Sequence, residues 1–306
     1  MRFAWRLLSS EPREISSEPG GERKKEMSSD RKKYADAMQQ VREKAPLVQC
    51  ITNFVTVNDC ANIILAAGGS PSMAHDIREV EEAVEGAQAL LCNMGAIEDT
   101  EAMVLAGKRA NQLGKPVVLD PVAAGGTTLR REAAKCLLRK VKFSAIRGNA
   151  SEIRGLAGEG STGSGVDVSV LDVITEENLK QSMEMVKTLA KKTGSVIAVS
   201  GVIDVISDGT QTMVLKNGCA TMSCITGSGC MLTSLIAAFC GAMPEDAFTA
   251  ACTAMAVMGV CGELAEEKRR KNGTGNATFR TDLIDAVFNL TEKQLMEGMR
   301  YEIYEG

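Results

Sequence analysis

From Pro46 onward, short runs rich in branched apolar residues alternate with longer stretches whose apolar residues recur at helical spacing. The short runs predict strands at 47–51, 70–73, 88–93, 116–120, 143–147, 195–200, 202–206 and 211–215. The longer stretches predict helices at 57–67, 78–86, 98–113, 129–140, 150–157, 176–193, 228–241, 244–268 and 278–297. This alternation is typical of a single α/β domain in which helices cover both faces of a mostly parallel central sheet.

The N-terminal segment differs from the rest of the chain. Residues 1–30 are charged and lack an apolar period, so we expect a disordered or upstream extension before one domain at 31–306. The first ten residues contain Arg2 and Arg6 without an acid, which would suit an organelle transit peptide. Several glutamates follow from Glu11 on, whereas transit peptides are poor in acids. The low-complexity stretch 158–165 is expected to be a surface loop.

Composition narrows the class of protein further. A net charge of -4 over 306 residues argues against a general nucleic-acid surface, which needs a basic stripe. No uninterrupted run of 18 apolar residues is present, so we expect no membrane span. The ten cysteines lie mostly inside apolar runs without C-x-x-C spacing, which favours reduced, packed thiols and a cytoplasmic location.

A glycine-rich turn, Thr226-Gly227-Ser228-Gly229-Cys230, immediately precedes an apolar stripe at helical spacing. Small residues at a helix start let an anion approach the unpaired N–H groups, and the helix dipole favours negative charge there. A phosphate group would therefore suit this turn. The same pattern also occurs where a helix simply packs closely, so the turn alone does not decide between the two interpretations.

Polar residues follow several predicted strands, at the edge where ligands collect in parallel sheets. Asn53, Asp120, Arg147 and Ser200 end strands, and Glu152 follows one closely. Asp120 and Glu152 together would suit Mg²⁺ held partly through water, while the helix start holds phosphate. Each residue also has a structural interpretation, such as a turn cap for Asp120 or a surface ion pair for Arg147. For Glu152 that alternative is a capping arrangement with Asn149.

Six ordered motifs over residues 46–268 resemble the hydroxyethylthiazole kinases, a family with the ribokinase-like three-layer fold. The motifs are Ile51-Thr52-Asn53 with Val55, Ser70-Pro71-Ser72-Met73-Ala74-His75, Asp120-Pro121-Val122 with Gly125, Ile146-Arg147-Gly148-Asn149-Ala150-Ser151-Glu152, Gly201 with Asp204-Val205-Ile206, and Thr226-Gly227-Ser228-Gly229-Cys230. The resemblance implies a kinase domain at 31–306 that uses ATP and Mg²⁺. Its acceptor would be the alcohol of 4-methyl-5-(2-hydroxyethyl)thiazole, in thiamine biosynthesis or salvage.

The resemblance also implies a homotrimer with the thiazole pocket between neighbouring subunits, and it assigns site residues. The thiazole would contact Asn53, Met73 and Gly227, while ATP would contact Arg147, Ser200, Gly227, Ser228 and Gly229. Asp120 and Glu152 would organise Mg²⁺. Met73 also suits an aromatic ring because its sulfur is polarizable, although methionine often only fills core gaps.

The proposed catalytic residue is Cys230, at a position where most ribokinase-like kinases carry aspartate. It would act either by positioning the alcohol in a loose transition state or as a thiolate, with a pKa lowered by the helix N-terminus. The single histidine, His75, receives no catalytic role. Segment 272–276 would either fold over adenine or form a plain turn.

One residue departs from the family pattern in the loop after Asp120, because Ala123 stands where the family usually has glycine. We therefore expect a slightly altered path at 122–127.

Three alternative functions remain open from the sequence. A hydroxymethylpyrimidine kinase and a nucleotide-dependent dehydratase that repairs hydrated nicotinamide cofactors share this fold, but aspartate is expected in place of Cys230 in both. A nucleotide-sensing pseudoenzyme is the third, and the retained Asp120 and Glu152 argue against it. Since one fold serves several functions, the choice depends on Cys230, Met73 and Asn53.

Overall fold

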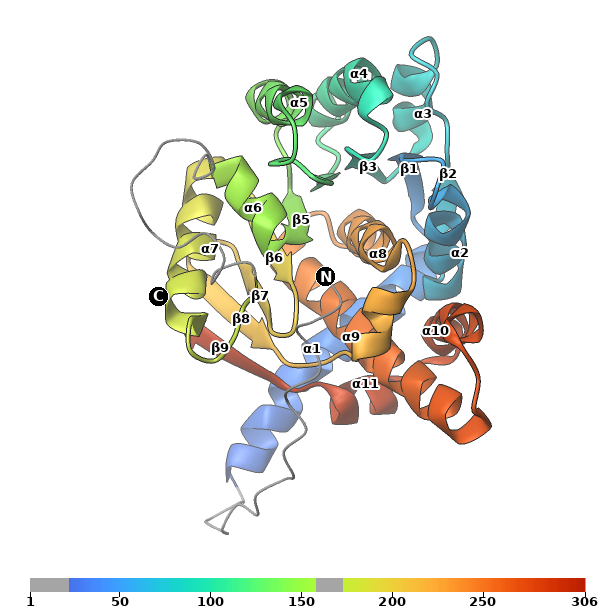
Figure 1. The fold of residues 1–306 in the computed structure, drawn as a ribbon, viewed down its shortest axis with the longest axis vertical. Coiled ribbons are helices and arrows are strands. Elements are labelled where there is room, and N and C mark those ends of the chain that lie inside the picture. The colour runs from blue at the N-terminus through green and yellow to red at the C-terminus, as the bar shows by residue number, and fades with distance from the viewer. Residues whose placement is uncertain (1–21, 158–172, 306) are drawn as a thin grey trace.

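The computed structural model describes residues 22–157 and 173–305, with side chains from residue 31 onward (Figure 1). Residues 1–21 of the predicted extension and the predicted loop at 158–165 lie outside the described residues. Within the described ranges the chain forms a 9-stranded sheet between two layers of helices. The predicted α/β sandwich is therefore confirmed.

The sheet has the order β2-β1-β3-β4-β5-β6-β7-β8-β9. Its strands are β1 (Leu47–Ile51), β2 (Ser70–Ser72), β3 (Ala89–Asn93), β4 (Val117–Asp120), β5 (Ala145–Asn149), β6 (Val196–Ser200), β7 (Asp204–Ser207), β8 (Gln211–Leu215) and β9 (Tyr301–Glu305). The strands from β2 to β6 pair in parallel, whereas β7, β8 and β9 add antiparallel neighbours. Parallel strands buried on both faces explain the nearly continuous apolar runs in the sequence.

Two groups of helices cover the two faces of the sheet. One face carries α1 (Glu22–Lys44), α2 (Val57–Ala67), α8 (Ser228–Ala242), α9 (Ala247–Asn272), α10 (Asn276–Asn289) and α11 (Glu292–Gly298). The other carries α3 (Val80–Gly86), α4 (Thr100–Gln112), α5 (Thr128–Lys140), α6 (Ala150–Ala157) and α7 (Leu179–Thr193). Short 3-10 helices lie at η1 (Ile97–Asp99) and η2 (Ala220–Cys224). Side chains alternate between the two faces along each strand. In β3, Leu91 packs against the first group of helices and Leu90 against the second.

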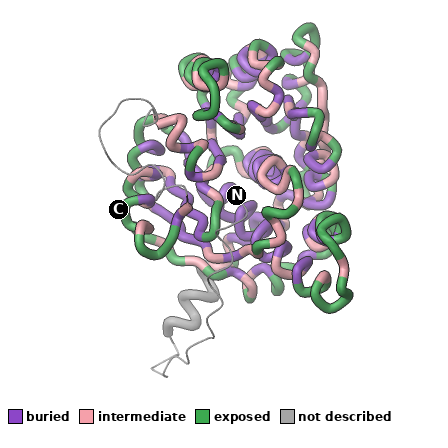
Figure 2. Tube along the Cα trace, viewed as in Figure 1, coloured by how far each residue is buried: buried purple, intermediate pink, exposed green. Residues whose placement is uncertain are grey.

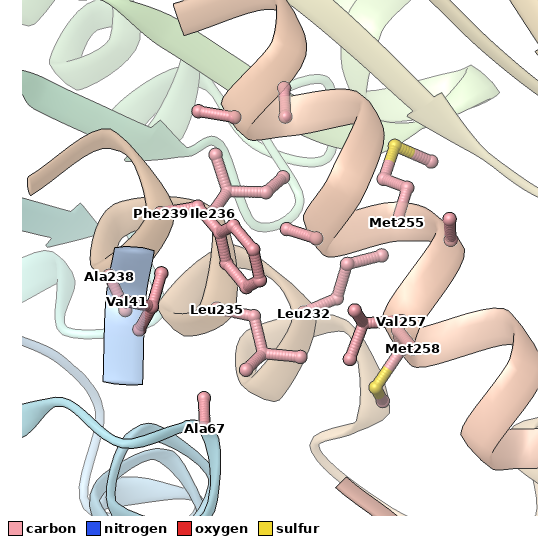
Figure 3. Packing of buried hydrophobic residues seen from close by; sticks show 14 of the residues in the cluster. Val41, Ala67, Leu232, Leu235, Ile236, Ala238, Phe239, Met255, Val257 and Met258 are labelled. Atoms are coloured by element: carbon pink, nitrogen blue, oxygen red, sulfur yellow. The ribbon is translucent and has the colours of Figure 1, made fainter. Parts of the chain in front are cut away.

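Helix α8 lies in the middle of the layer formed by α1, α2 and α8 to α11, here called the α8 layer, where many buried residues lie (Figures 2 and 3). Leu235, Ile236 and Phe239 of α8 are almost completely buried and pack with Met255 of α9. By length and hydropathy α9 would be able to cross a membrane, but 78% of its most apolar window is buried inside the protein. It is the long core helix of this layer. Because α8 packs against α9 in this core, the N-terminus of α8 is held in a fixed position.

Some elements differ from the sequence prediction. Helix α1 and strand β9 were not predicted, and the single helix predicted at 278–297 is wrong, because α10 and α11 are separate. Thr291 begins α11 with a capping box: its side chain accepts from the Gln294 N–H, and the Gln294 side chain accepts from the Thr291 N–H. Strand β7 starts at Asp204, later than predicted, because the Asp204 carboxylate accepts the Gly201 N–H and closes a turn.

Candidate active site at the N-terminus of helix α8

Polar residues from separate strands meet along one edge of the sheet. Asn93 at the end of β3 pairs in register with Asp120 at the end of β4. Arg147 lies in β5, Ser200 ends the neighbouring β6, and Asn53 follows β1. These strands are parallel, so their carboxyl ends share this edge. The fold therefore brings together four of the residues that the sequence singled out, Asn53, Asp120, Arg147 and Ser200.

Two glycines shape the start of α8 at this edge. Gly227 has a φ of 82°, and a Cβ there would lie 2.7 Å from the Cγ2 of Thr56, so a side chain is excluded both by conformation and by space. A Cβ on Gly229 would overlap the guanidinium group of Arg147. The Arg147 Nη2 donates to the Ser200 hydroxyl. A fixed positive charge thus lies over the first turn of α8, where free N–H groups also favour an anion.

A cavity of about 480 Å³ opens beside this turn. Arg147, Ser200, Ser228 and Gly229 line its polar part. The remaining lining is largely apolar and includes Ile174, Met222, Leu232, Met255 and Met258. This volume is in the range of small-molecule sites, and its mostly apolar lining with a few polar groups is typical of them. Gly227 is not part of the lining.

Asp120 is 1% exposed, and only one of its carboxylate oxygens is satisfied within the protein. Its Oδ2 accepts from the Thr233 Oγ1 at 2.8 Å and from the Asn93 Nδ2 at 3.3 Å. Its Oδ1 has no hydrogen-bond partner among the described residues. Burial raises the pKa of Asp120 to about 6, although the Arg147 charge opposes this rise. Above pH 6 the carboxylate is mostly charged and keeps one oxygen free for a ligand.

Glu152 performs the capping role that the sequence left open. Its Oε2 accepts the Asn149 N–H at 2.8 Å, and the Asn149 side chain accepts the Glu152 N–H at 2.9 Å. Its Oε1 accepts the Ala123 N–H at 3.0 Å, so Glu152 also holds the loop after β4. The negative charge of Glu152 raises the pKa of Asp120, so the two carboxylates interact. Glu152 therefore has a capping role and also lies close enough to Asp120 to raise its pKa.

Ala123, in this loop, has a φ of 55°. This left-handed conformation is one that glycine adopts without strain, which is a physical reason for a glycine at this position in the family.

Cys230 lies partly buried in the first turn of α8, where its sulfur accepts a 3.6 Å hydrogen bond from the Asn53 Nδ2. Burial raises the pKa of the Cys230 thiol, and the Asp120 charge raises it further. Both effects act against the thiolate alternative considered from the sequence and favour the neutral thiol.

Asn53 is itself held firmly. Its Oδ1 accepts from the N–H groups of Val55 and Thr56 at 3.1 Å and from the Thr56 hydroxyl at 3.2 Å. Its Nδ2 therefore points to the Cys230 sulfur and to the Asn93 Oδ1, which lies 3.4 Å away. The amide is locked next to Cys230 before any substrate binds.

Two residues of this site were missed by the sequence interpretation, because Asn93 and Thr233 both donate to Asp120. Asp204, which the sequence interpretation included only as part of a motif, lines the cavity. Asn93 is a polar residue at the end of an apolar strand, the same signal that identified Asp120. Thr233 carries no such signal, because it is one hydroxyl inside an apolar helix.

Other candidates lie apart from the cavity. Met73 follows β2, is half buried and packs against the core of the α8 layer. His75 is exposed, with its Nδ1 3.4 Å from the Met73 carbonyl oxygen. The turn at 272–276 does not contribute to the cavity lining, and Gly273 ends α9 in a left-handed conformation. This turn caps α9, which agrees with the interpretation of 272–276 as a plain turn.

The protein has the ribokinase-like fold. A pyridoxal kinase from Staphylococcus aureus, solved with AMP-PCP and pyridoxal, superposes with a TM-score of 0.56 at 16% identity, over 85% of this chain and 99% of that one. This level of identity shows the fold alone.

The family follows from closer matches. The model of the hydroxyethylthiazole kinase family matches residues 38–293. Hydroxyethylthiazole kinase from Clostridium acetobutylicum is 46% identical over 88% of this chain and 99% of its own length. That from Clostridium beijerinckii is also 46% identical, over 85% and 93%. The solved hydroxyethylthiazole kinase protein from Pyrococcus horikoshii has a TM-score of 0.78 at 32% identity, covering 90% and 100%. The chain belongs to the hydroxyethylthiazole kinase family and is a phosphotransferase.

Proposed function

We propose that the protein transfers the γ-phosphoryl group of ATP to the hydroxyl of 4-methyl-5-(2-hydroxyethyl)thiazole, in thiamine biosynthesis or salvage. The first turn of α8 carries this proposal. Ser228 and Gly229 face the cavity, whereas Cys230 contacts Asn53. A phosphoryl group at this turn would lie between a nucleotide in the cavity and an alcohol near Cys230, which is the arrangement that in-line transfer requires.

Magnesium is part of the proposal because the residues present suit it. The unpartnered Oδ1 of buried Asp120 is an available hard oxygen ligand, and Glu152 lies near enough to influence its pKa. Among the described residues no group of three or more His, Cys, Asp or Glu side chains is arranged to hold a metal. Mg²⁺ in kinases is commonly held by one or two carboxylates together with the substrate phosphates. When bound, it would neutralise charge on the transferring phosphate.

The protein's own groups would act mainly by orientation and charge. Arg147 is held by Ser200 over the turn and would bind phosphate oxygens, together with the N–H groups of α8. Asn53 would orient the thiol of Cys230 and the acceptor next to it. A loose transition state retains the alcohol proton until late, so a neutral thiol is compatible with transfer.

We further propose a homotrimer in which a neighbouring subunit completes the thiazole pocket. Asn53 donates to Cys230 within one chain, whereas Met73 does not line the cavity of its own chain. Phe54, next to Asn53, is 84% exposed, so an apolar surface borders the acceptor side. Mixing an inactive Met73 variant with an inactive Cys230 variant under subunit exchange is expected to restore part of the activity. Failure to recover activity in demonstrated mixed oligomers would place each pocket within one chain.

A cytoplasmic location is also proposed. All ten cysteines are free thiols, several of them buried in the core, as suits a reducing compartment. Fractionation of the native cells with antibody detection tests this directly, and recovery in an organelle or secreted fraction would contradict it.

A substrate panel tests the proposed reaction. Purified protein is incubated with Mg-ATP and thiazole, pyrimidine and sugar alcohols, and products are identified by mass spectrometry. We expect the thiazole phosphate together with an equal amount of ADP. A pyrimidine phosphate without thiazole product, or ATP-dependent dehydration of a hydrated nicotinamide cofactor, would overturn the assignment.

A further inference from the structure

The side chain of Asn93 is completely buried between Asn53 and Asp120. Its Oδ1 accepts the Gly95 N–H at 2.8 Å and faces the Asn53 Nδ2 at 3.4 Å. Its Nδ2 donates to the Asp120 Oδ2 at 3.3 Å. Two donors on one side and a carboxylate on the other leave a single satisfactory orientation for this amide.

The hydrogen bonds run in one direction through the site. Thr56 donates to Asn53, Asn53 donates to Asn93, and Asn93 donates to Asp120. Asn53 also donates to the Cys230 sulfur, and the side chains of Asn93 and Thr56 lie within hydrogen-bonding reach of the same thiol. The chain of amides therefore connects the acceptor side of the site with the carboxylate on the phosphate side, through residues that come from different strands.

Space around Asn93 is as restricted as its hydrogen bonding. A Cβ on Gly95 would lie 2.6 Å from the Asn53 Nδ2 and 2.7 Å from the Asn93 Oδ1, so the backbone packs directly on both amides. Neither amide has room to move independently. Displacing Asn93 would therefore displace Asn53 and release one of the two donors that orient Asp120.

We propose that Asn93 is a positioning residue for phosphoryl transfer, which holds the Asp120 carboxylate and the Asn53–Cys230 pair in a common register. With Asn93 and Thr233 both donating to Oδ2, the Oδ1 of Asp120 is the oxygen left for a ligand. A residue that touches neither substrate can control a reaction in this way, because groups behind a ligand-binding carboxylate determine its orientation.

The test compares Asn93→Ala with two matched variants. Thr233→Val removes the other donor to Asp120, and the other hydrogen-bond partner of the Thr233 hydroxyl within the described residues is the Gly229 carbonyl oxygen, not Asn53. Thr253→Val removes a buried hydroxyl in α9 that bonds only locally to the Thr249 carbonyl. Each variant is assayed for kcat, for KM of the thiazole alcohol and of ATP, and for Tm.

We expect Asn93→Ala to lower kcat about 10- to 100-fold and to raise the KM of the alcohol several-fold, with the KM of ATP within about twofold. Thr233→Val is expected to lower kcat alone, and Thr253→Val to change only Tm. If Asn93→Ala does not fold, Asn93→Leu has a similar shape, cannot donate to Asp120, and must show the same pattern of kcat and KM changes.

The inference rests on the proposed phosphoryl transfer, and the assay separates the two. A parent protein that does not phosphorylate the thiazole alcohol contradicts the proposed function. An active parent with an Asn93 variant that keeps kcat within threefold overturns the positioning role alone. A loss of activity that only follows Tm, as in Thr253→Val, overturns it as well.

Discussion

The buried carboxyl group of Asp204 predicts how the folding stability of the protein changes with pH. Asp204 lines the cavity proposed for the nucleotide, is 7% exposed, and its carboxylate accepts the Gly201 N–H at 2.9 Å. Burial raises the pKa of Asp204 to about 7 from the ordinary 3.8, while the Gly201 hydrogen bond and the Arg147 charge oppose the rise. Near neutral pH a substantial fraction is therefore uncharged, which spares the nucleotide phosphates a negative neighbour.

The sign of the pH dependence follows from linkage. Below pH 3.8 Asp204 is protonated in both the folded and the unfolded state, so its contribution is fully present. As pH rises towards 7 the unfolded state ionises first, and folding stability is progressively lost. At about 1.4 kcal/mol per pKa unit, the loss between about pH 5 and pH 8 is roughly 2 to 3 kcal/mol.

Asp204→Asn removes this titration and keeps an oxygen that can accept the Gly201 N–H. The assay measures Tm of both proteins at one protein concentration from about pH 5 to 8, so that the other titrating groups cancel in the difference. We expect the variant to gain roughly 3 to 5 °C relative to the parent across this range. A Tm difference that stays constant with pH would refute the raised pKa and the argument from burial.

Three further predictions concern the turn and the carboxylates. Glu152→Gln is expected to lower kcat by about 10² or more, because it removes a charge near the phosphates, and an unchanged rate at low magnesium would remove Glu152 from the site. Gly229→Ala is expected to displace Arg147 and raise the KM of ATP about tenfold or more, and an unchanged KM would contradict the phosphate role. Cys230→Asp is expected to match or exceed the parent kcat because a carboxylate accepts the alcohol proton more readily than a neutral thiol, while Cys136→Ala, on α5, serves as the thiol control. A folded Cys230→Asp protein that binds both substrates but is inactive would leave positioning and charge as the whole mechanism.

Much of the fold was predictable because local patterns and tertiary structure agree. The apolar run at 47–51 forms β1 as predicted, since a central parallel strand is buried on both faces. Helix α1 was not predictable in this way, because its segment is dominated by charged residues. It is stabilised by burying Tyr34 and Val41 against the α8 layer, a contact made by residues far away in the chain. Likewise β9 is a half-exposed strand that depends on pairing with β8.

The site was predictable in its residue types but not in its electrostatics. Asp120 and Arg147 were identified from their places at strand ends, which parallel topology brings to one edge. For the pKa of Cys230, the local sequence shows only the lowering effect of the helix N-terminus, and the role of the thiol stays a prediction. Burial and the Asp120 charge, which raise that pKa, come from packing against other elements.

The two sides of the first turn of α8 differ in the proposed site: one would bind the nucleotide and the other would position the acceptor alcohol. The side proposed for the nucleotide is a preformed cavity in one chain, where Arg147 and the helix start supply positive charge. The side proposed for the acceptor is a set of buried amides around Cys230, whose thiol has a raised pKa. A neutral thiol next to the acceptor leaves charge neutralisation and alignment as the main sources of rate enhancement. The buried contacts of Asn93 are therefore expected to affect the rate, and a stronger proton acceptor at position 230 would add to them.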